Sequence, residues 1–183
     1  MQNQIDYNRI RQLKEEKTAI SKIRHDFTGI ISTAAGFIEL GNYEKALSIL
    51  TNAGSDVFGS NEKFCHNELI NIILQLKKNT AKQADTELLF DITESSKLNI
   101  DDYDICRLLN NLIDNSINAA QLTSEKKSFV SIAIDRDEVV VKTKNRFNST
   151  AKRPKRDESK HGFGTKIIKD IAKKYGGKKS VVI

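Results

Sequence analysis

The sequence predicts an α+β protein in which an N-terminal helical hairpin is followed by a two-layer α/β sandwich. Three observations support this fold class. The first forty residues lack proline and repeat apolar residues at helical spacing. The middle of the chain combines helical apolar patterns with short alternating ones. A last helical pattern follows a polar, basic stretch. We therefore expect two domains, a hairpin over residues 1–60 and a sandwich over residues 61–183.

The first predicted helix carries apolar residues at steps of three and four, which is a heptad repeat typical of bundled helices. Gly41 and Asn42 predict the end of this helix and a turn, and Tyr43–Ala53 returns to helical spacing. One hairpin cannot cover such a wide apolar stripe, so the pattern predicts a homodimer that forms a four-helix bundle. The heptad residues are Ile20, Ile23, Phe27, Ile30, Ala34 and Phe37.

The second half of the chain reads as helices and strands in mixed order after a turn-rich linker over 54–67. Helix, strand, helix, paired strands, loop and helix in that order predict a two-layer sandwich. The expected helices cover 69–76, 104–120 and 162–175, the strands cover 87–92, 129–134 and 138–142, and a basic loop covers 145–159.

Composition sets broad limits on the protein. An apolar content of 38% is enough to build a folded core. A net charge of +6 favours acidic partners in general, but charge alone does not identify the partner. No apolar stretch is long enough to span a bilayer, and the start lacks the apolar core of a secretory signal. We expect a cytoplasmic protein, and a piece cut from the cytoplasmic part of a membrane sensor would read the same way. Cys65 and Cys106 lack metal-ligand spacing and are expected to be buried thiols.

His25 falls at position f of the heptad repeat, the position furthest from the apolar seam. An exposed imidazole there offers a ring nitrogen as a nucleophile. Asp26 can orient the ring or take its proton, and Arg24 adds positive charge where a phosphoryl group would arrive. From position alone, a plain solvated surface histidine is the simpler explanation, because surface residues seldom do chemistry.

Asn111, Asn115 and Asn118 recur at steps of four and three on the helix expected over 104–120, so they line up on one face. Amide side chains offer neutral donors and acceptors together, which suits Mg²⁺ and phosphate oxygens. A polar face with chance asparagines is the alternative. Gly162 and Gly164 are expected at the start of the last helix, where their backbone could approach a phosphate, although a lone GxG is more often a turn.

The segment RHDFTGIISTAAGFIELGNYEKAL resembles the phospho-acceptor region of the sensor histidine kinases that serve peptide quorum sensing in Gram-positive bacteria. The resemblance implies that His25 is the phosphorylated residue and that Asp26 is its assisting carboxylate. Many members carry asparagine four residues after the histidine, where it positions water for dephosphorylation. Because Gly29 stands there, the resemblance gives no support for phosphatase activity.

The order of elements in the second half resembles the Bergerat-type ATP-binding fold of the GHKL superfamily. That order is an asparagine helix, two strands, a basic loop, a GxG motif and another helix. The resemblance implies ATP and Mg²⁺ as cofactors, with Asn115 as the metal ligand and residues 148–160 as a lid. Asn145 stands where the superfamily has an adenine-reading aspartate in a DxGxG motif, which this chain lacks. The residues implied to bind the nucleotide are Asn111, Asn115, Asn145, His161, Gly162 and Gly164.

The predicted function is that of a histidine autokinase. Hydrolytic superfamily members place glutamate where Asn111 stands, so phosphoryl transfer fits better than hydrolysis. The γ-phosphoryl group of Mg-ATP would pass to His25 and then to an aspartate on the receiver domain of a response regulator. Two alternatives stay open, namely a phosphorelay phosphotransferase with a degenerate ATP domain and a non-catalytic dimeric scaffold. We expect no nucleic-acid binding, because the basic stretch Lys152–Lys179 lacks interleaved aromatic residues and any recognised reading motif.

Overall fold

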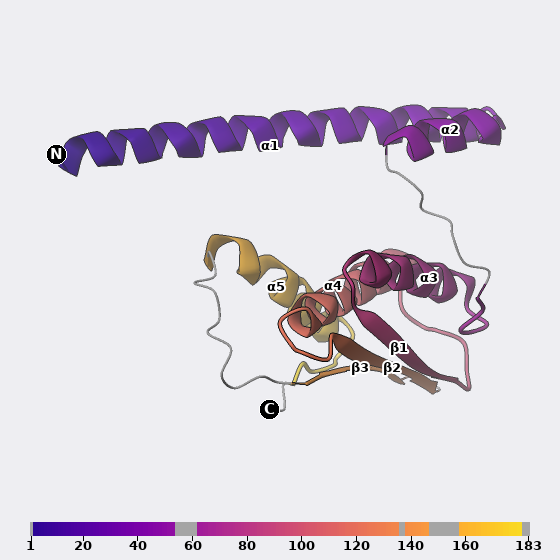
Figure 1. The fold of residues 1–183 in the computed structure, drawn as a ribbon. Helices are drawn as coiled ribbons and strands as arrows, with labels where there is room; N and C mark the ends of the chain where they lie inside the picture. The colour runs from indigo at the N-terminus through magenta and orange to yellow at the C-terminus, as the bar shows by residue number, and fades with distance from the viewer. Residues whose placement is uncertain (1, 54–61, 136–137, 147–157, 181–183) are drawn as a thin grey trace. The chain divides into compact units, whose positions relative to one another are not determined.

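The computed structural model describes residues 2–53, 62–135, 138–146 and 158–180 (Figure 1). The chain divides into two compact units, Met1–Val57 and Phe58–Ile183.

The first unit is a helical hairpin made of α1 (Gln2–Glu39) and α2 (Tyr43–Ala53). Gly41 has φ of +71°, the left-handed conformation that glycine adopts without strain. The N–H of Asn42 donates to the carbonyl of Phe37 at 2.8 Å, and the N–H of Gly41 donates to the carbonyl of Ile38 at 2.9 Å. This pair of bonds is the Schellman motif, which ends α1. Both predicted helices and the glycine stop between them are confirmed.

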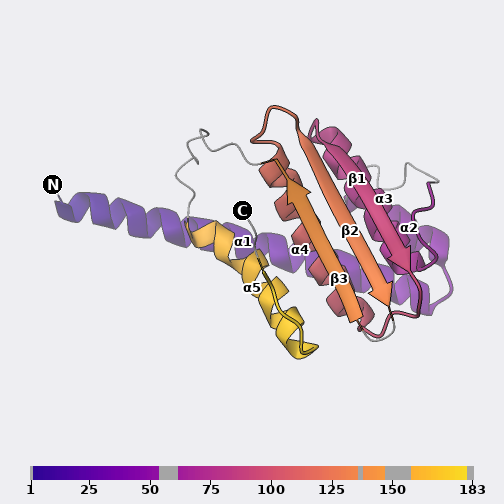
Figure 2. The same ribbon diagram turned by 90° about the horizontal axis from the view of Figure 1, so that it is seen from below.

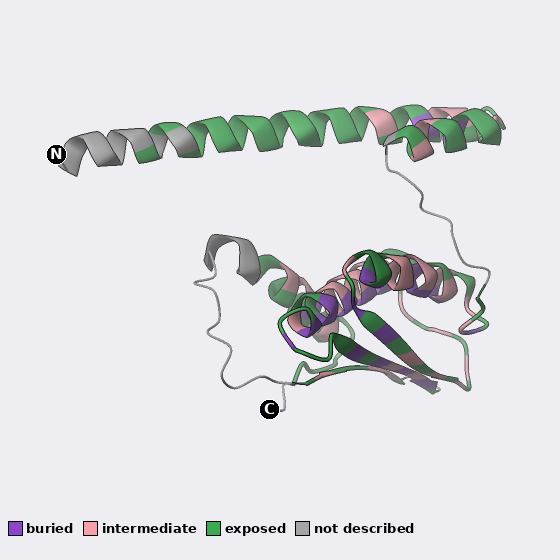
Figure 3. Cartoon of the chain, viewed as in Figure 1, coloured by how far each residue is buried: buried purple, intermediate pink, exposed green. Residues whose placement is uncertain are grey.

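The two helices of the hairpin bury only a small area against each other. Ala34 of α1 and Ala46 of α2 are buried, whereas Ile20 is 65% exposed and Phe27 is 53% exposed. Figure 3 shows that the exposed residues of α1 continue to its C-terminal turns, where α2 lies alongside. The heptad seam is therefore largely uncovered within one chain, and the four-helix bundle stays a prediction.

The second unit is built on a three-stranded mixed sheet in the order β1-β2-β3 (Figure 2). Strands β1 and β2 are parallel with α4 between them in sequence, and β2 and β3 form an antiparallel hairpin. The predicted strands and helices are all present, and most extend a few residues further. The elements are α3 (Glu68–Gln83), β1 (Glu87–Glu94), α4 (Asp102–Ala120), β2 (Lys127–Asp135), β3 (Glu138–Asn145) and α5 (Glu158–Lys174).

Helices α3 and α4 cover one face of this sheet and enclose the core with it (Figures 1 and 2). On β2, every second side chain from Ser128 to Ile134 is buried. The alternate residue Phe129 is 49% exposed on the other face. A sheet with one covered face and one face in water gives this alternation, so the predicted two-layer arrangement is confirmed for this unit. The largest fully buried side chains include Ile70, Leu74, Ile105, Leu109, Ile113 and Ile132.

Helix α5 packs against α4. The expectation that Gly162 and Gly164 lie at the start of this helix is wrong, because α5 begins at Glu158 and both glycines lie inside it. A glycine inside a helix costs only about 1 kcal/mol relative to alanine, which packing of the apolar stripe can offset. Ile168 and Ile171 supply that packing, since both are buried. The expected lid over 148–160 lies mainly outside the described residues.

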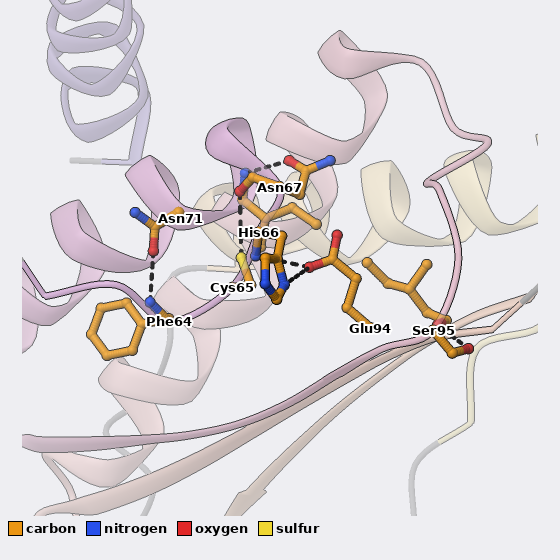
Figure 4. Close-up of polar contacts among 9 residues, drawn as sticks. Phe64, Cys65, His66, Asn67, Asn71, Glu94 and Ser95 are labelled. Atoms are coloured by element: carbon orange, nitrogen blue, oxygen red, sulfur yellow. Dashed lines mark hydrogen bonds and ion pairs between the residues drawn. The ribbon is translucent and has the colours of Figure 1, made fainter.

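The C-terminal part of the predicted linker is fixed to the second unit. Figure 4 shows the contacts that hold it. The N–H of Phe64 donates to Asn71 Oδ1 at 2.7 Å, and the N–H of His66 donates to Glu94 Oε2 at 2.9 Å. Asn67 caps α3 by accepting the N–H of Ile70 at 3.0 Å. We call residues 62–67 the anchored segment.

Side-chain packing also holds the anchored segment. The rings of Phe64 and Phe90 meet edge to face with centroids 4.9 Å apart, and Lys78 lies over the Phe64 ring and pairs with Glu62 at 2.6 Å. Cys65 is buried, as expected, and burial raises the pKa of its thiol. The expectation of a linker running to Asn67 is therefore corrected, because residues 62–67 form part of the second unit.

Candidate functional site

The asparagine row lies on the side of α4 that faces away from the core. Asp101 caps the helix by accepting the N–H groups of Tyr103 and Asp104 at 3.0 and 3.3 Å. The apolar stripe of α4 is buried against the sheet and α3. This orientation leaves Asn111 half-buried and Asn115 exposed. The sequence prediction of an aligned polar face is confirmed for this helix.

Gly164 of α5 lies directly beside this row. A Cβ on Gly164 would be 2.8 Å from Oδ1 of Asn111 and 3.8 Å from Nδ2 of Asn115. Nδ2 of Asn111 donates to the carbonyl of Arg107 at 2.7 Å, so the direction of this amide is fixed. The structure therefore brings together three of the residues that the sequence analysis singled out.

These residues fit a nucleotide with its metal ion. Mg²⁺ takes oxygen ligands and keeps several waters, which suits an exposed asparagine oxygen such as that of Asn115. Helix α5 can approach Asn111 this closely because residue 164 has no side chain, and any Cβ there would clash with Asn111 Oδ1. Amide groups can also donate to phosphate oxygens without a charge of their own.

Asn145, at the end of β3, is joined to α4 through Ser116. Its Oδ1 accepts the Ser116 hydroxyl at 2.8 Å, and its Nδ2 donates to the Ser116 carbonyl at 3.0 Å. The Ser116 hydroxyl also bonds to the hydroxyl of Ser128, which is paired with Asn145 in the β2–β3 register. Asn145 is therefore fixed to the residue that follows Asn115 on α4.

The two serines of this network were not predicted from the sequence. Ser116 is 2% exposed and Ser128 is fully buried. Both interrupt apolar patterns, because Ser116 follows Ile113 by three residues on the buried stripe and Ser128 begins the inward row of β2. A polar residue at a core position indicates a buried hydrogen bond, and this signal could have identified them.

A second unpredicted cluster ties the C-terminal end of α5 to the start of α4. The carboxylate of Asp104 accepts hydrogen bonds from Lys174 Nζ and from the Tyr175 hydroxyl, the latter at 3.0 Å. The Lys174 hydrogen bond holds the pKa of Asp104 below its ordinary value, and Asp104 in turn raises the pKa of Lys174. This clasp helps to fix α5 across α4, which keeps Gly164 against Asn111.

Helix α3 supports the site from its other side. Lys77 Nζ donates to Asp114 Oδ1 at 2.6 Å, and the Lys77 side chain is only 12% exposed. Asp114 immediately precedes Asn115. The ion pair therefore joins α3 to the turn of α4 that carries Asn115.

His25 lies on α1 in the first unit and points into solvent. Its side chain is 89% exposed, and Nδ1 lies 3.4 Å from Oδ1 of Asp26, whose side chain is 60% exposed. The imidazole is exposed, as expected, but seam residues such as Ile20 and Phe27 are exposed as well, so its position opposite the seam of a bundle stays a prediction. A ring held through Nδ1 leaves Nε2 free for other contacts.

His161 and Gly162 belong to α5, but their side-chain surroundings lie outside the described residues.

Comparison with known proteins finds one family match, and it covers both α4 and α5. Residues 100–183 match the family model described as the GHKL domain. No curated protein matches the sequence. GHKL domains occur in ATP-binding kinases and ATPases and bind ATP, usually with Mg²⁺. The matched region contains Asn111, Asn115, Asn145 and Gly164. None of the described helices is long and apolar enough to cross a membrane.

Proposed function

We propose that this chain is a histidine autokinase that phosphorylates His25 with ATP. The observation that carries the proposal is the close approach of Gly164 to Asn111 and Asn115 inside a region that matches the GHKL domain. An exposed histidine with an adjacent carboxylate on the preceding helical hairpin supplies an acceptor. A GHKL domain alone would fit an ATPase as well, and the His25–Asp26 pair favours the kinase.

The α4–α5 face would bind the nucleotide. Asn115 would hold Mg²⁺, which when bound neutralises phosphate charge, and Asn111 would contact the phosphates beside Gly164. Asn111 is a poor general base, because an amide does not accept a proton near neutral pH. Water is therefore not activated at that position, which favours transfer to a side chain over hydrolysis.

The transfer step uses the two groups of the first unit. The Nε2 lone pair of His25 attacks the γ-phosphorus, and a nitrogen–phosphorus bond forms as the bond to the β,γ-bridging oxygen breaks. The electron pair of that bond leaves on ADP. Asp26 accepts the hydrogen bond from Nδ1–H, stabilises the positive charge that develops on the ring, and then carries the proton to solvent.

The proposal includes a second copy of the chain and a response regulator. The uncovered seam at Ile20 and Phe27 supports pairing with a second hairpin in a four-helix bundle. Phosphohistidine has a high transfer potential, so the aspartate of a receiver domain is a suitable final acceptor. The chain would act in the cytoplasm, either alone or as the cytoplasmic part of a membrane sensor.

Incubation with γ-³²P-labelled ATP and Mg²⁺ tests the proposal. We expect acid-labile label on the wild-type chain and none on His25→Gln or Asn115→Ala. Two control variants are expected to keep the label. Ser32→Ala changes another exposed position f of α1, and Asn99→Ala changes an exposed residue of the second unit.

The other outcomes separate the alternatives. Label that persists in His25→Gln contradicts the assignment of the acceptor. Nucleotide binding without label on any variant favours a scaffold. Label received only from a phosphorylated receiver domain favours a phosphorelay phosphotransferase.

A further inference from the structure

Helix α5 contacts α4 at two separate places. In the first half of α5, Gly164 lies against the side chain of Asn111. At its C-terminal end, Lys174 and Tyr175 reach the carboxylate of Asp104. Gly164 and Lys174 are ten residues apart in the sequence, which is about 15 Å of helix. The position of α5 on α4 is therefore defined at two points along its length.

The C-terminal contact is held by directed bonds. The Tyr175 hydroxyl donates to Asp104 Oδ2 at 3.0 Å and accepts the N–H of Asp101 at 3.1 Å. Lys174 Nζ donates to the same oxygen of Asp104, whose side chain is only 8% exposed. Gly164 has no side chain that could hold the helix, so its close approach to α4 depends on where the rest of α5 lies.

Two packed isoleucines lie between these contacts. Ile168 and Ile171 are each 4% exposed and stand near the midpoint between Gly164 and Lys174. Apolar burial is not directional, so this packing alone permits α5 to tilt. Because a short helix moves as one rigid body, a tilt that moves Lys174 by about 1 Å moves Gly164 by roughly the same distance in the opposite direction.

We propose that the clasp of Asp104, Lys174 and Tyr175 positions α5 for nucleotide binding and thereby sets the nucleotide affinity of the α4–α5 face. This inference rests on the proposed function, in which the phosphates lie beside Asn111. The clasp fixes the C-terminal end of α5, and the helix carries that position to Gly164. Without the clasp, the binding-competent position is only one of several, and the apparent affinity falls by the fraction of molecules that occupy it.

Isothermal titration calorimetry of the full chain with Mg²⁺ and the slowly hydrolysed β,γ-imido analogue of ATP tests this inference. Lys174→Met keeps the aliphatic stem and Tyr175→Phe keeps the ring, so both remove bonds with little loss of packing. The double variant is expected to bind at least about fivefold more weakly than the wild type. A smaller loss overturns the inference.

Lys173→Met is the matched control, because it removes the same charge from an exposed neighbour on α5. It is expected to bind within about twofold of the wild type, since long-range attraction of exposed charges is screened by salt. A loss as large as that of Lys174→Met would show that charge and not position matters. Lys174→Arg keeps a cation that can donate to Asp104 and is expected to rescue the affinity, and a failure to rescue contradicts the inference.

A double-mutant cycle identifies the route. In a Gly164→Ala background the Asn111 amide is already displaced, so adding Lys174→Met and Tyr175→Phe is expected to weaken binding by less than about twofold further. A full additional loss in that background would show that the clasp does not act through Gly164, which overturns the inference.

Two more readouts separate the other failures. Urea unfolding shows whether each variant is folded under the titration conditions. If the double variant is unfolded, Tyr175→Phe alone, which removes one hydroxyl, is expected to bind at least about threefold more weakly, and wild-type affinity there overturns the inference. A wild-type chain that does not bind the analogue contradicts the proposed function, and the inference falls with it. Equal binding by wild type and folded double variant contradicts the inference alone.

Discussion

Gly164 on α5 lies so close to the Asn111 side chain on α4 that a Cβ there would be 2.8 Å from Oδ1. Gly164 and Asn111 are 53 positions apart in the sequence. Their contact depends on the missing side chain at residue 164 and on the fixed direction of the Asn111 amide. Asn111 is held by its bond to the Arg107 carbonyl. The relationship predicts how the site responds to a single added methyl group.

Gly164→Ala is expected to weaken nucleotide binding by about tenfold or more while changing stability little. The new Cβ must displace the Asn111 amide, which breaks its alignment with Asn115. Because the displaced atom is at the end of a side chain, the cost in folding free energy is modest. Alanine also favours the helix by about 1 kcal/mol relative to glycine, which offsets that cost. Calorimetric titration and urea unfolding measure the two effects separately.

Gly29→Ala is the matched control, since Gly29 also lies within a helix and an added Cβ there meets nothing within 4 Å. It is expected to leave nucleotide binding unchanged. Wild-type affinity in Gly164→Ala would mean that Asn111 does not contact the ligand.

Asp104→Asn is expected to remove a stabilising contribution that depends on pH. The folded-state pKa of Asp104 is lowered, so its contribution is fully present above the ordinary value of 3.8 and is lost as pH falls through the folded pKa. The pKa of Lys174 is raised, so its contribution is present below 10.5 and is lost as pH rises through its folded pKa. The difference in unfolding free energy between wild type and Asp104→Asn should therefore be largest between these limits.

Urea unfolding of both proteins from about pH 2 to 11 checks this profile. Asp102→Asn, an exposed aspartate in the same turn, is expected to show a much smaller difference. A difference between wild type and Asp104→Asn that stays constant across the acid range would show that the clasp with Lys174 does not form.

Phe27→Glu is expected to convert a dimer into a monomer. Phe27 is 53% exposed in the single chain and belongs to the uncovered heptad seam. Burying one phenylalanine contributes about 1.5–3 kcal/mol, and a symmetric dimer loses two copies, so the dissociation constant should rise by at least about 100-fold. Light scattering coupled to size-exclusion chromatography reports the mass.

Ser32→Glu places the same charge at position f, on the opposite side of α1, and is expected to leave the mass unchanged. A wild-type chain that is monomeric at micromolar concentration would contradict the four-helix bundle.

Glu94→Ala is expected to loosen the anchored segment. Glu94 accepts the His66 N–H at 2.9 Å and its side chain is only 16% exposed. Loss of a hydrogen bond to a charged acceptor costs about 1.5–3 kcal/mol. Hydrogen exchange at the His66 amide should become faster by at least tenfold. Thr93→Ala, an exposed neighbour on β1, should leave that rate unchanged, and an unaltered rate in Glu94→Ala would show that Glu94 does not hold the segment.

Much of the secondary structure could be predicted because it depends on local patterns. The three-and-four spacing of Ile20, Ile23 and Phe27 defines α1, and Gly41 ends it through its own backbone freedom. The alternation of β2 follows from one buried face. The start of α5 could not be predicted in this way. Gly162 and Gly164 are weak helix formers, and packing of Ile168 and Ile171 outweighs that preference.

The sequence by itself determined the alignment of Asn111 with Asn115, because residues four apart on a helix lie on the same face. The tertiary structure alone decided that Gly164 faces Asn111, that Ser116 holds Asn145 and that Lys174 reaches Asp104. These contacts join residues 29 to 70 positions apart. Such pairs are set by how helices and strands pack, and no local pattern encodes that packing.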